Sequence, residues 1–222
     1  SAASDVYKRQ VLNRFGEVES FGLLKYEEVA EKIADADIVV CNKTLLDSHT
    51  MRLAKNLKYI GLFATGYNNI DLDYCAKNGI TVCNAGSYST NAVAQHTFAL
   101  ILEHYSKISE YDRFVKNGGW IKSKTFSKFP IRTMELLGKT ISIIGFGGIG
   151  KTVAGIASAF GMNVIVNTRT IPEDCPYEIV PLDEAFRRAD VLTVHCPLTE
   201  QTKGIINAEH LSLMKETAIV VN

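Results

Sequence analysis

The stretch Thr140–Gly150 reads TISIIGFGGIG, and it decides the fold class of this chain. Its first five residues form an apolar, β-branched run with the length of a buried strand. Glycines then stand at Gly145, Gly147 and Gly150, and an amphipathic helical pattern continues to Phe160. The apolar positions of that helix recur at spacings of three and four residues, at Ile149, Val153, Ile156, Ala157 and Phe160.

A GxGxxG loop between a strand and a helix is the fingerprint of dinucleotide binding. Gly145 permits the tight turn, Gly147 lets a pyrophosphate approach the backbone, and Gly150 lets the helix pack closely on the strand. Gly148 and Ile149 lie at the start of the helix, whose free N–H groups and partial positive charge suit phosphates. The alternative is a glycine-rich turn in some other α/β protein.

Apolar runs and helical patterns alternate along most of the chain, which predicts an α/β fold with parallel sheets. Runs that are apolar on both faces suit strands covered by helices on both sides. A longer helix is predicted over Thr90–Ser106, with Ser89, Thr90 or Asn91 available as its N-cap. The expected strands are Asp37–Cys41, Lys58–Phe63, Ile80–Cys83, Thr140–Ile144, Asn163–Asn167, Asp190–His195 and Thr217–Val221.

The segment Asn117–Leu137 interrupts this alternation and is predicted to be a long loop. We expect two units, residues 11–87 and residues 88–222.

Ser1–Gln10 resembles a translated sequencing adapter, although a natural polar N-terminus is the alternative. The last residues, Ala218–Asn222, form an apolar run typical of a buried strand, so we expect the chain to be a fragment of a longer protein.

The composition excludes several function classes. Lys plus Arg and Asp plus Glu are both 24 among 222 residues, so charge gives no case for nucleic acid or a membrane surface as partner. No apolar run approaches the roughly 18 residues of a membrane span, and no secretion signal is present. The five cysteines are scattered and form no CxxC pair. We therefore expect no disulfide framework and no metal site, but reduced thiols in a cytoplasmic protein.

The strand that follows the glycine loop bears on the choice of cofactor. Such a strand often ends in an acid that bonds the adenine ribose of NAD. Here Thr168 stands at that position and Arg169 follows it. An arginine can pair with a 2′-phosphate that a carboxylate would repel, so we predict an NAD(P) site in which NADP(H) is accepted and preferred. A solvated Arg169 without a ribose contact is the alternative.

Ligands in open α/β sheets bind at the carboxyl ends of the strands. His195, Cys196 and Pro197 follow one predicted strand, and Asn222 follows another. We therefore place these four residues beside the cofactor. By itself, His195 would more often be a structural loop residue.

Four motifs together resemble the D-isomer-specific 2-hydroxyacid dehydrogenases in order and spacing. They are TGYNNID at Thr65–Asp71, STNAVAQH at Ser89–His96, the glycine loop, and HCPLT at His195–Thr199. Within that family the chain is most similar to the glycerate dehydrogenases, also called hydroxypyruvate or glyoxylate reductases. The resemblance covers residues 13–222.

The resemblance implies a flavodoxin-like substrate domain and a Rossmann dinucleotide-binding domain, both incomplete. It implies that backbone N–H groups at Thr65 and Gly66 bind the substrate carboxylate, in a loop whose Gly and Asn residues tolerate positive φ and form an anion nest. An ordinary turn with Asp71 as the cap of the next helix is the alternative, and both readings are compatible. Thr65 would also touch the nicotinamide and Val93 would pack near it, although a helical valine is otherwise core.

The family's catalytic Arg, Glu and His would all lie beyond Asn222. No histidine of this chain matches the family's acid, neither His49, His96, His104, His195 nor His210. The fragment itself is expected to bind cofactor weakly at best and not to turn over.

We therefore predict an oxidoreductase that transfers a hydride between NAD(P)H and a small 2-keto acid or D-2-hydroxy acid. The resemblance implies a homodimer formed largely through the Rossmann domain and the helix at Thr90–Ser106. A non-catalytic, corepressor-like dinucleotide sensor on the same fold is the rival, and a generic Rossmann protein with another substrate is a further one. Phosphoglycerate, D-lactate and formate stay open as substrates.

Overall fold

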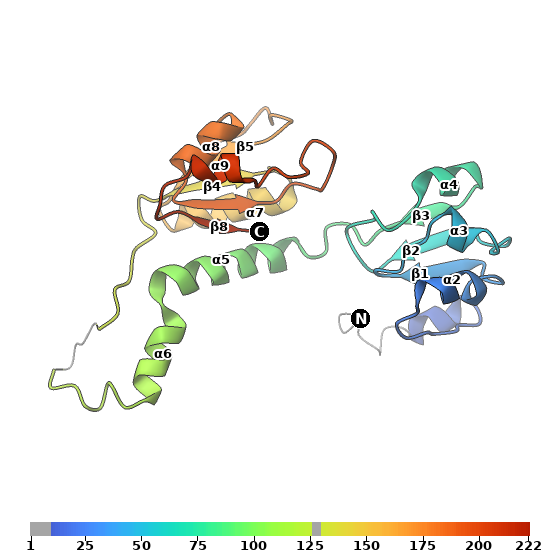
Figure 1. Ribbon diagram of the computed structural model, residues 1–222, viewed down its shortest axis with the longest axis horizontal. Helices are drawn as coiled ribbons and strands as arrows, with labels where there is room; N and C mark the ends of the chain where they lie inside the picture. Colours follow the sequence, from blue (N-terminus) through green and yellow to red (C-terminus); the bar gives the residue numbers. More distant parts are fainter. Residues whose placement is uncertain (1–9, 126–129) are drawn as a thin grey trace. The chain divides into compact units, whose positions relative to one another are not determined.

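In the computed structural model, residues 10–125 and 130–222 are described, and the chain divides into two compact units between Tyr88 and Ser89 (Figure 1). The adapter-like segment Ser1–Gln10 lies outside the described residues, apart from its last residue. The elements of the first unit are η1 (Gln10–Arg14), α2 (Tyr26–Lys32), β1 (Ile38–Cys41), α3 (Ser48–Met51), β2 (Tyr59–Leu62), α4 (Leu72–Lys77) and β3 (Thr81–Cys83).

The first unit is built on a parallel sheet in the order β1-β2-β3. Residues from α2, α3 and α4 share one hydrophobic core with Ile60 and Leu62 of β2. The opposite face carries Ile38 and Val40, which are 53% and 36% exposed. Both side chains belong to β1, which is an edge strand, whereas the central strand β2 is largely buried. All three strands lie within the predicted ranges.

The second unit has more elements. They are α5 (Thr90–Ser106), α6 (Ile108–Lys116), β4 (Thr140–Ile144), α7 (Gly148–Ala159), β5 (Asn163–Asn167), β6 (Glu178–Ile179), α8 (Leu182–Arg188), β7 (Val191–Val194), α9 (Ala208–Ser212) and β8 (Ile219–Val221). The bounds of α5, β4 and β5 are those predicted. Sequence reasoning missed α6 and the two-residue strand β6.

The sheet of the second unit is wholly parallel, in the order β6-β5-β4-β7-β8. The chain runs outward from β4 through β5 to β6, and then returns to β7 on the other side of β4. Apolar residues of α5 and α7 pack with Ile141 and Ile143 on one face, whereas Phe186 of α8 packs with Ile144 and Leu192 on the other. This is a doubly wound Rossmann sheet, and its switch point lies between β4 and β7.

The amino ends of the two central strands are joined by Asp190. Its carboxylate accepts a hydrogen bond from the Thr140 amide at 2.8 Å and one from Lys215 at 3.0 Å. Burial alone would raise the pKa of Asp190, but these two donors outweigh it and the pKa is lowered. The opposite, carboxyl ends of β4 and β7 are therefore held in register for the loops that follow them.

Candidate functional site

The loop between β4 and α7 is fixed at its first glycine. Gly145 has a φ of +92°, and its amide donates to Asn167 O at 2.8 Å. A Cβ on Gly145 would lie 2.6 Å from Cys196 N and 2.8 Å from His195 C. Only glycine satisfies both the backbone angle and this close approach, so the loop after β7 packs directly against the turn.

Gly150 and Gly147, the other two glycines of the motif, are present for different physical reasons. A Cβ on Gly150 would collide with Gly145 O, so α7 can pack on β4 only with glycine there. At Gly147 the same atom would meet nothing within 4 Å, and its φ is −78°. Nothing in the described chain requires glycine at position 147. Besides its favourable N-cap conformation, space for a ligand is a physical reason for glycine there.

The N-terminus of α7 is open to an anion. Gly147 is its N-cap residue, and no side chain caps the helix. The N–H groups of Gly148 and Ile149 thus belong to the first turn, where helical N–H groups lack partners within the helix. A loop that presents free N–H groups beside an open backbone fits a pyrophosphate.

His195 and Cys196 follow β7 and lie against this turn. The His195 amide donates to Ile144 O at 2.7 Å, and the His195 ring Nε2 lies 2.9 Å from the buried Thr193 hydroxyl. Burial lowers the pKa of His195 and raises that of the Cys196 thiol. His195 is therefore neutral near pH 7 and is held by a hydrogen bond within its own strand, while Pro197, two residues later, is exposed.

Thr168 and Arg169 follow β5 at the same edge of the sheet. Thr168 is half-buried, and its hydroxyl donates to Thr170 O at 3.3 Å. Arg169 is exposed and forms no ion pair with any residue that the structure describes. Its guanidinium is free for a phosphate. Further along the same connection, residues 172–174, 176 and 177 line a cavity of about 470 Å³ together with Phe146 and Lys151.

The remaining predicted cofactor residues lie on α5 and β8. Thr90, in the first turn of α5, would be 3.6 Å from a Cβ on Gly148, which places this turn beside the glycine loop. Val93 stands one turn further along α5, is half-buried, and is absent from the core cluster of its unit. Asn222 follows β8, which pairs with β7 at the sheet edge. The structure thus brings the glycine loop, His195–Cys196 and the start of α5 together.

Thr65 and Gly66 lie in the first unit, in the loop that follows β2. Thr65 Oγ1 donates to Gly86 O at 2.9 Å. Gly66 does not have a positive φ, so the expected left-handed nest at that glycine was wrong; the positive φ in this region is at Gly86, +60°. Hydrogen bonds between this loop and residues 84–86 determine its conformation. The residue types of the loop alone could not indicate these bonds. Asp71 caps α4 by accepting from Tyr74 N at 2.9 Å, as expected.

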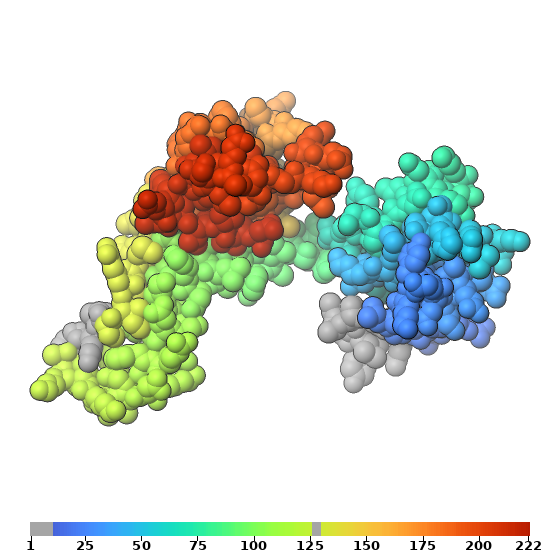
Figure 2. Space-filling model, viewed as in Figure 1, coloured from blue at the N-terminus to red at the C-terminus, as the bar shows by residue number. Residues whose placement is uncertain are grey.

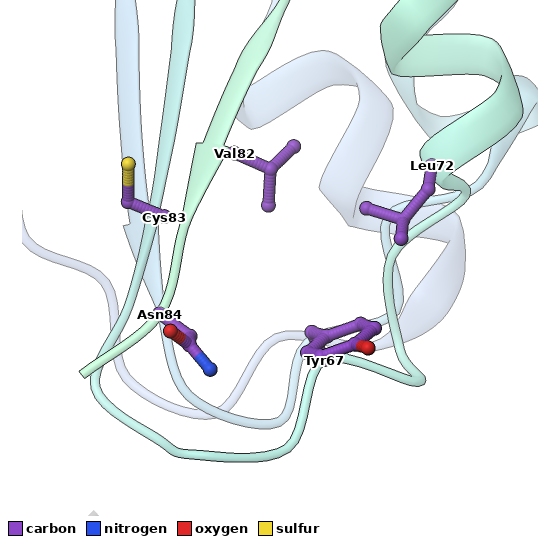
Figure 3. A pocket seen from close by; sticks show the side chains of 5 residues that line it. All are labelled: Tyr67, Leu72, Val82, Cys83 and Asn84. Carbon is purple, nitrogen blue, oxygen red and sulfur yellow. The ribbon is translucent and has the colours of Figure 1, made fainter. Parts of the chain in front are cut away.

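A hollow of about 420 Å³ lies beside this loop (Figure 3). Tyr67, Leu72 and Val82 surround it, and Cys83 and Asn84 stand at its margin at the end of β3. Sequence reasoning missed Asn84. Its position directly after a strand of a parallel sheet was the signal that could have indicated it.

Groups of three or more His, Cys, Asp or Glu that could hold a metal ion are absent from the described residues. Within the same residues, none of the helices has the length and apolarity that crossing a bilayer requires. The five cysteines are free thiols.

Comparison with protein families matches residues 98–222 to the family described as "D-isomer specific 2-hydroxyacid dehydrogenase, NAD binding domain". The chain is 37% identical over 205 residues to a hydroxypyruvate reductase of Blautia hydrogenotrophica, covering 90% of this chain and 63% of that protein. The chain spans about three fifths of the length of the first curated relatives that it matches.

Two solved structures extend this similarity to the fold. One is an acyclic imino acid reductase in complex with NADPH and D-Arg, with a TM-score of 0.87 and 30% identity, covering 100% of this chain and 71% of that one. The other is the D-lactate dehydrogenase of Aquifex aeolicus with NAD and lactic acid, with a TM-score of 0.78 and 32% identity over 87% of this chain and 58% of that one. Both sheets and the glycine loop thus have experimentally observed counterparts.

Proposed function

The chain belongs to the D-isomer-specific 2-hydroxyacid dehydrogenase family, and we propose that the whole protein transfers a hydride between NAD(P)H and a small 2-keto acid. The observation that carries this proposal is the turn at Gly145–Gly150. It has an open position at Gly147, an uncapped helix N-terminus and the switch point of a Rossmann sheet in one place.

Each part of the chain has a distinct role in this proposal. N–H groups at the start of α7 bind the pyrophosphate, and His195–Pro197 with Val93 flank the cofactor. N–H groups of Thr65 and Gly66 bind the substrate carboxylate. The nicotinamide supplies the hydride. We propose that a group other than His195 protonates the keto oxygen, because burial lowers the pKa of His195 and its ring lies 2.9 Å from the Thr193 hydroxyl.

The substrate is proposed to be hydroxypyruvate or glyoxylate. Relatives of similar identity carry the names hydroxypyruvate reductase, glyoxylate reductase and glycerate dehydrogenase, which supports small 2-keto acids as the class. We also propose a cytoplasmic location, on the basis of the reduced cysteines. Oxidation of NADPH by the whole protein, followed by absorbance with each keto acid in turn, tests the activity. A whole protein that binds NADPH and reduces no 2-keto acid would favour the sensor-type rival.

We further propose that NADPH is preferred to NADH. Arg169 is exposed, unpaired within the described residues and adjacent to the end of β5, whereas Thr168 offers no carboxylate. Arg169→Ala is expected to raise the KM for NADPH about tenfold or more, since a charge-assisted bond contributes roughly 1.5–3 kcal/mol. The KM for NADH should change less than about twofold, which is within the ordinary effect of a surface substitution.

The control for this prediction is Arg187→Ala on α8, which removes an exposed arginine that pairs with Asp183 and Glu184 instead. It should alter neither constant. A wild-type protein that strongly prefers NADH would contradict the proposed preference outright.

We propose that the whole protein is a homodimer formed through the second unit, including α5. The neighbouring α6 supports this, because none of its residues is buried and it extends away from the sheet of its unit (Figure 1). In Figure 2 the same segment, in yellow-green, projects from the rest of its unit. Ile108 and Val115 of α6 are 55% and 50% exposed, and Ile121, shortly after it, is 87% exposed. Ile108 and Val115 are seven residues apart on one helix and so lie on the same helix face, and exposed apolar faces are typical of interfaces.

A charge on this face should separate the subunits. Val115→Glu is expected to shift the whole protein from dimer to monomer in sedimentation velocity. Phe15→Glu, at a residue of the first unit that is 78% exposed, should leave the dimer intact. A wild-type protein that sediments as a monomer at every concentration would refute the dimer.

A further inference from the structure

Two loops at the carboxyl edge of the first unit's sheet are tied together by three hydrogen bonds. The Ala85 amide donates to Ala64 O at 3.0 Å, and Asn84 Nδ2 donates to Thr65 O at 2.7 Å. In the opposite direction, Thr65 Oγ1 donates to Gly86 O at 2.9 Å. Figure 3 shows the Asn84 side chain directed from the end of β3 into the space enclosed by the loop that carries Tyr67.

These bonds fix two consecutive peptide planes. A peptide unit is planar and trans, so its C=O and N–H point in opposite directions. The carbonyl of Ala64 and the amide of Thr65 belong to one plane, and the carbonyl of Thr65 and the amide of Gly66 belong to the next. Because Ala85 and Asn84 hold the two carbonyls, both N–H groups are directed away from residues 84–85.

The two amides are free to bind an anion. No hydrogen bond among the described residues uses the N–H of Thr65 or of Gly66, and both residues are exposed. Gly66 needs neither a positive φ nor close packing, since the nearest atom to a Cβ there would be Asn68 Oδ1 at 3.6 Å. Glycine at this position thus leaves the approach to the amides open.

We propose that Asn84 is a positioning residue for the substrate carboxylate. Resting on the proposed function, this inference assigns to Asn84 the orientation of the Thr65–Gly66 peptide. Its carboxamide is itself oriented, because Asn84 Oδ1 accepts from Gly86 N at 3.4 Å while Nδ2 donates to Thr65 O. A donor on the carbonyl also polarises the peptide and strengthens the Gly66 N–H as a donor to an anion.

Asn84→Ala separates this role from a structural one, because Asn84 is exposed and its loss leaves no buried group unpaired. The matched control is Asn78→Ala. Asn78 is also an exposed asparagine of the first unit, and its Nδ2 donates to Tyr74 O at 2.8 Å, at the C-terminal end of α4. Each variant removes one amide-to-carbonyl bond, and only the bond of Asn84 orients the proposed site.

The first test uses this 222-residue chain and oxalate, whose carboxylates resemble that of a 2-keto acid. In ¹H–¹⁵N spectra, oxalate should shift the Thr65 and Gly66 amides of the wild type and of Asn78→Ala. In Asn84→Ala the apparent affinity should fall about tenfold, as expected when the peptide between Thr65 and Gly66 loses its orientation and one amide bond to the charged carboxylate is weakened. Equal affinity in Asn84→Ala, or a wild type whose two amides do not respond to oxalate, overturns the assignment.

The second test uses the whole protein with NADPH and hydroxypyruvate. Asn84→Ala should raise the KM for the keto acid about tenfold, by the same weakening of the amide bonds to the carboxylate, and leave the KM for NADPH unchanged. An equal rise in both constants would contradict a role at the carboxylate. Suppose that oxalate binding is weakened by Asn84→Ala but the wild type reduces no 2-keto acid. This result would refute the proposed function and leave the positioning role standing.

Discussion

Replacement of Gly147 by valine is expected to weaken NADPH binding by the whole protein roughly hundredfold, which corresponds to about 2.7 kcal/mol. The position is open in the structure, because a Cβ there would meet nothing within 4 Å, and the valine side chain is expected to occupy the space proposed for the pyrophosphate. The backbone conformation, with φ −78°, accepts a β-branched residue. Loss of a favourable N-cap residue typically costs about 1 kcal/mol of stability. Calorimetric titration with NADPH measures the change in affinity, and thermal unfolding measures the stability.

Gly155→Val is the control for this prediction. Gly155 lies in the same helix, α7, and a Cβ there would also meet nothing within 4 Å. The same side chain is thereby introduced away from the proposed ligand and should leave the affinity unchanged. If Gly147→Val bound NADPH as tightly as Gly155→Val, the pyrophosphate would not lie at the turn, and the cofactor site would have to be sought elsewhere.

The elements that local patterns determine were predictable from the sequence. The bounds of β4, β5 and α5 agree with the prediction because β-branched runs and periodic apolar faces specify them residue by residue. The glycine loop was predictable for the same reason, since its chemistry is contained in eleven consecutive residues, Thr140–Gly150. The parallel order of the strands followed from the alternation of strand and helix.

Features that depend on distant residues were not predictable. Lys107 adopts a φ of 53° and separates α5 from α6, although nothing in a lysine indicates a left-handed residue. The role proposed for Asn84 depends on its hydrogen bond to the carbonyl of Thr65, 19 residues earlier in the chain. Glycine at position 66 was expected to allow a positive φ, but its φ is not positive. Hydrogen bonds from residues 84–85 determine the conformation of the loop instead. In each case the deciding partner is tertiary, and a single sequence does not reveal it.

Gly145→Ala is expected to destabilise the second unit by roughly 3 kcal/mol or more, because an unfavourable φ and an overpacked contact add together. The φ of +92° is strained for alanine, and its Cβ would lie 2.6 Å from Cys196 N and 2.8 Å from His195 C. Neither backbone atom can move without disturbing the pairing of β4 with β7. The corresponding fall in Tm is roughly 10 °C, measured by thermal unfolding of this chain.

The same substitution two residues away gives the control. Gly147→Ala introduces a Cβ that meets nothing within 4 Å at a φ of −78°, so its cost should stay near the loss of the cap, about 1 kcal/mol. The pair therefore separates the two reasons for glycine in one loop: Gly145 is required by the fold, and Gly147 by the ligand. Equal stability losses in the two alanine variants would contradict this division, because the close approach of Cys196 to the turn would then be absent in solution.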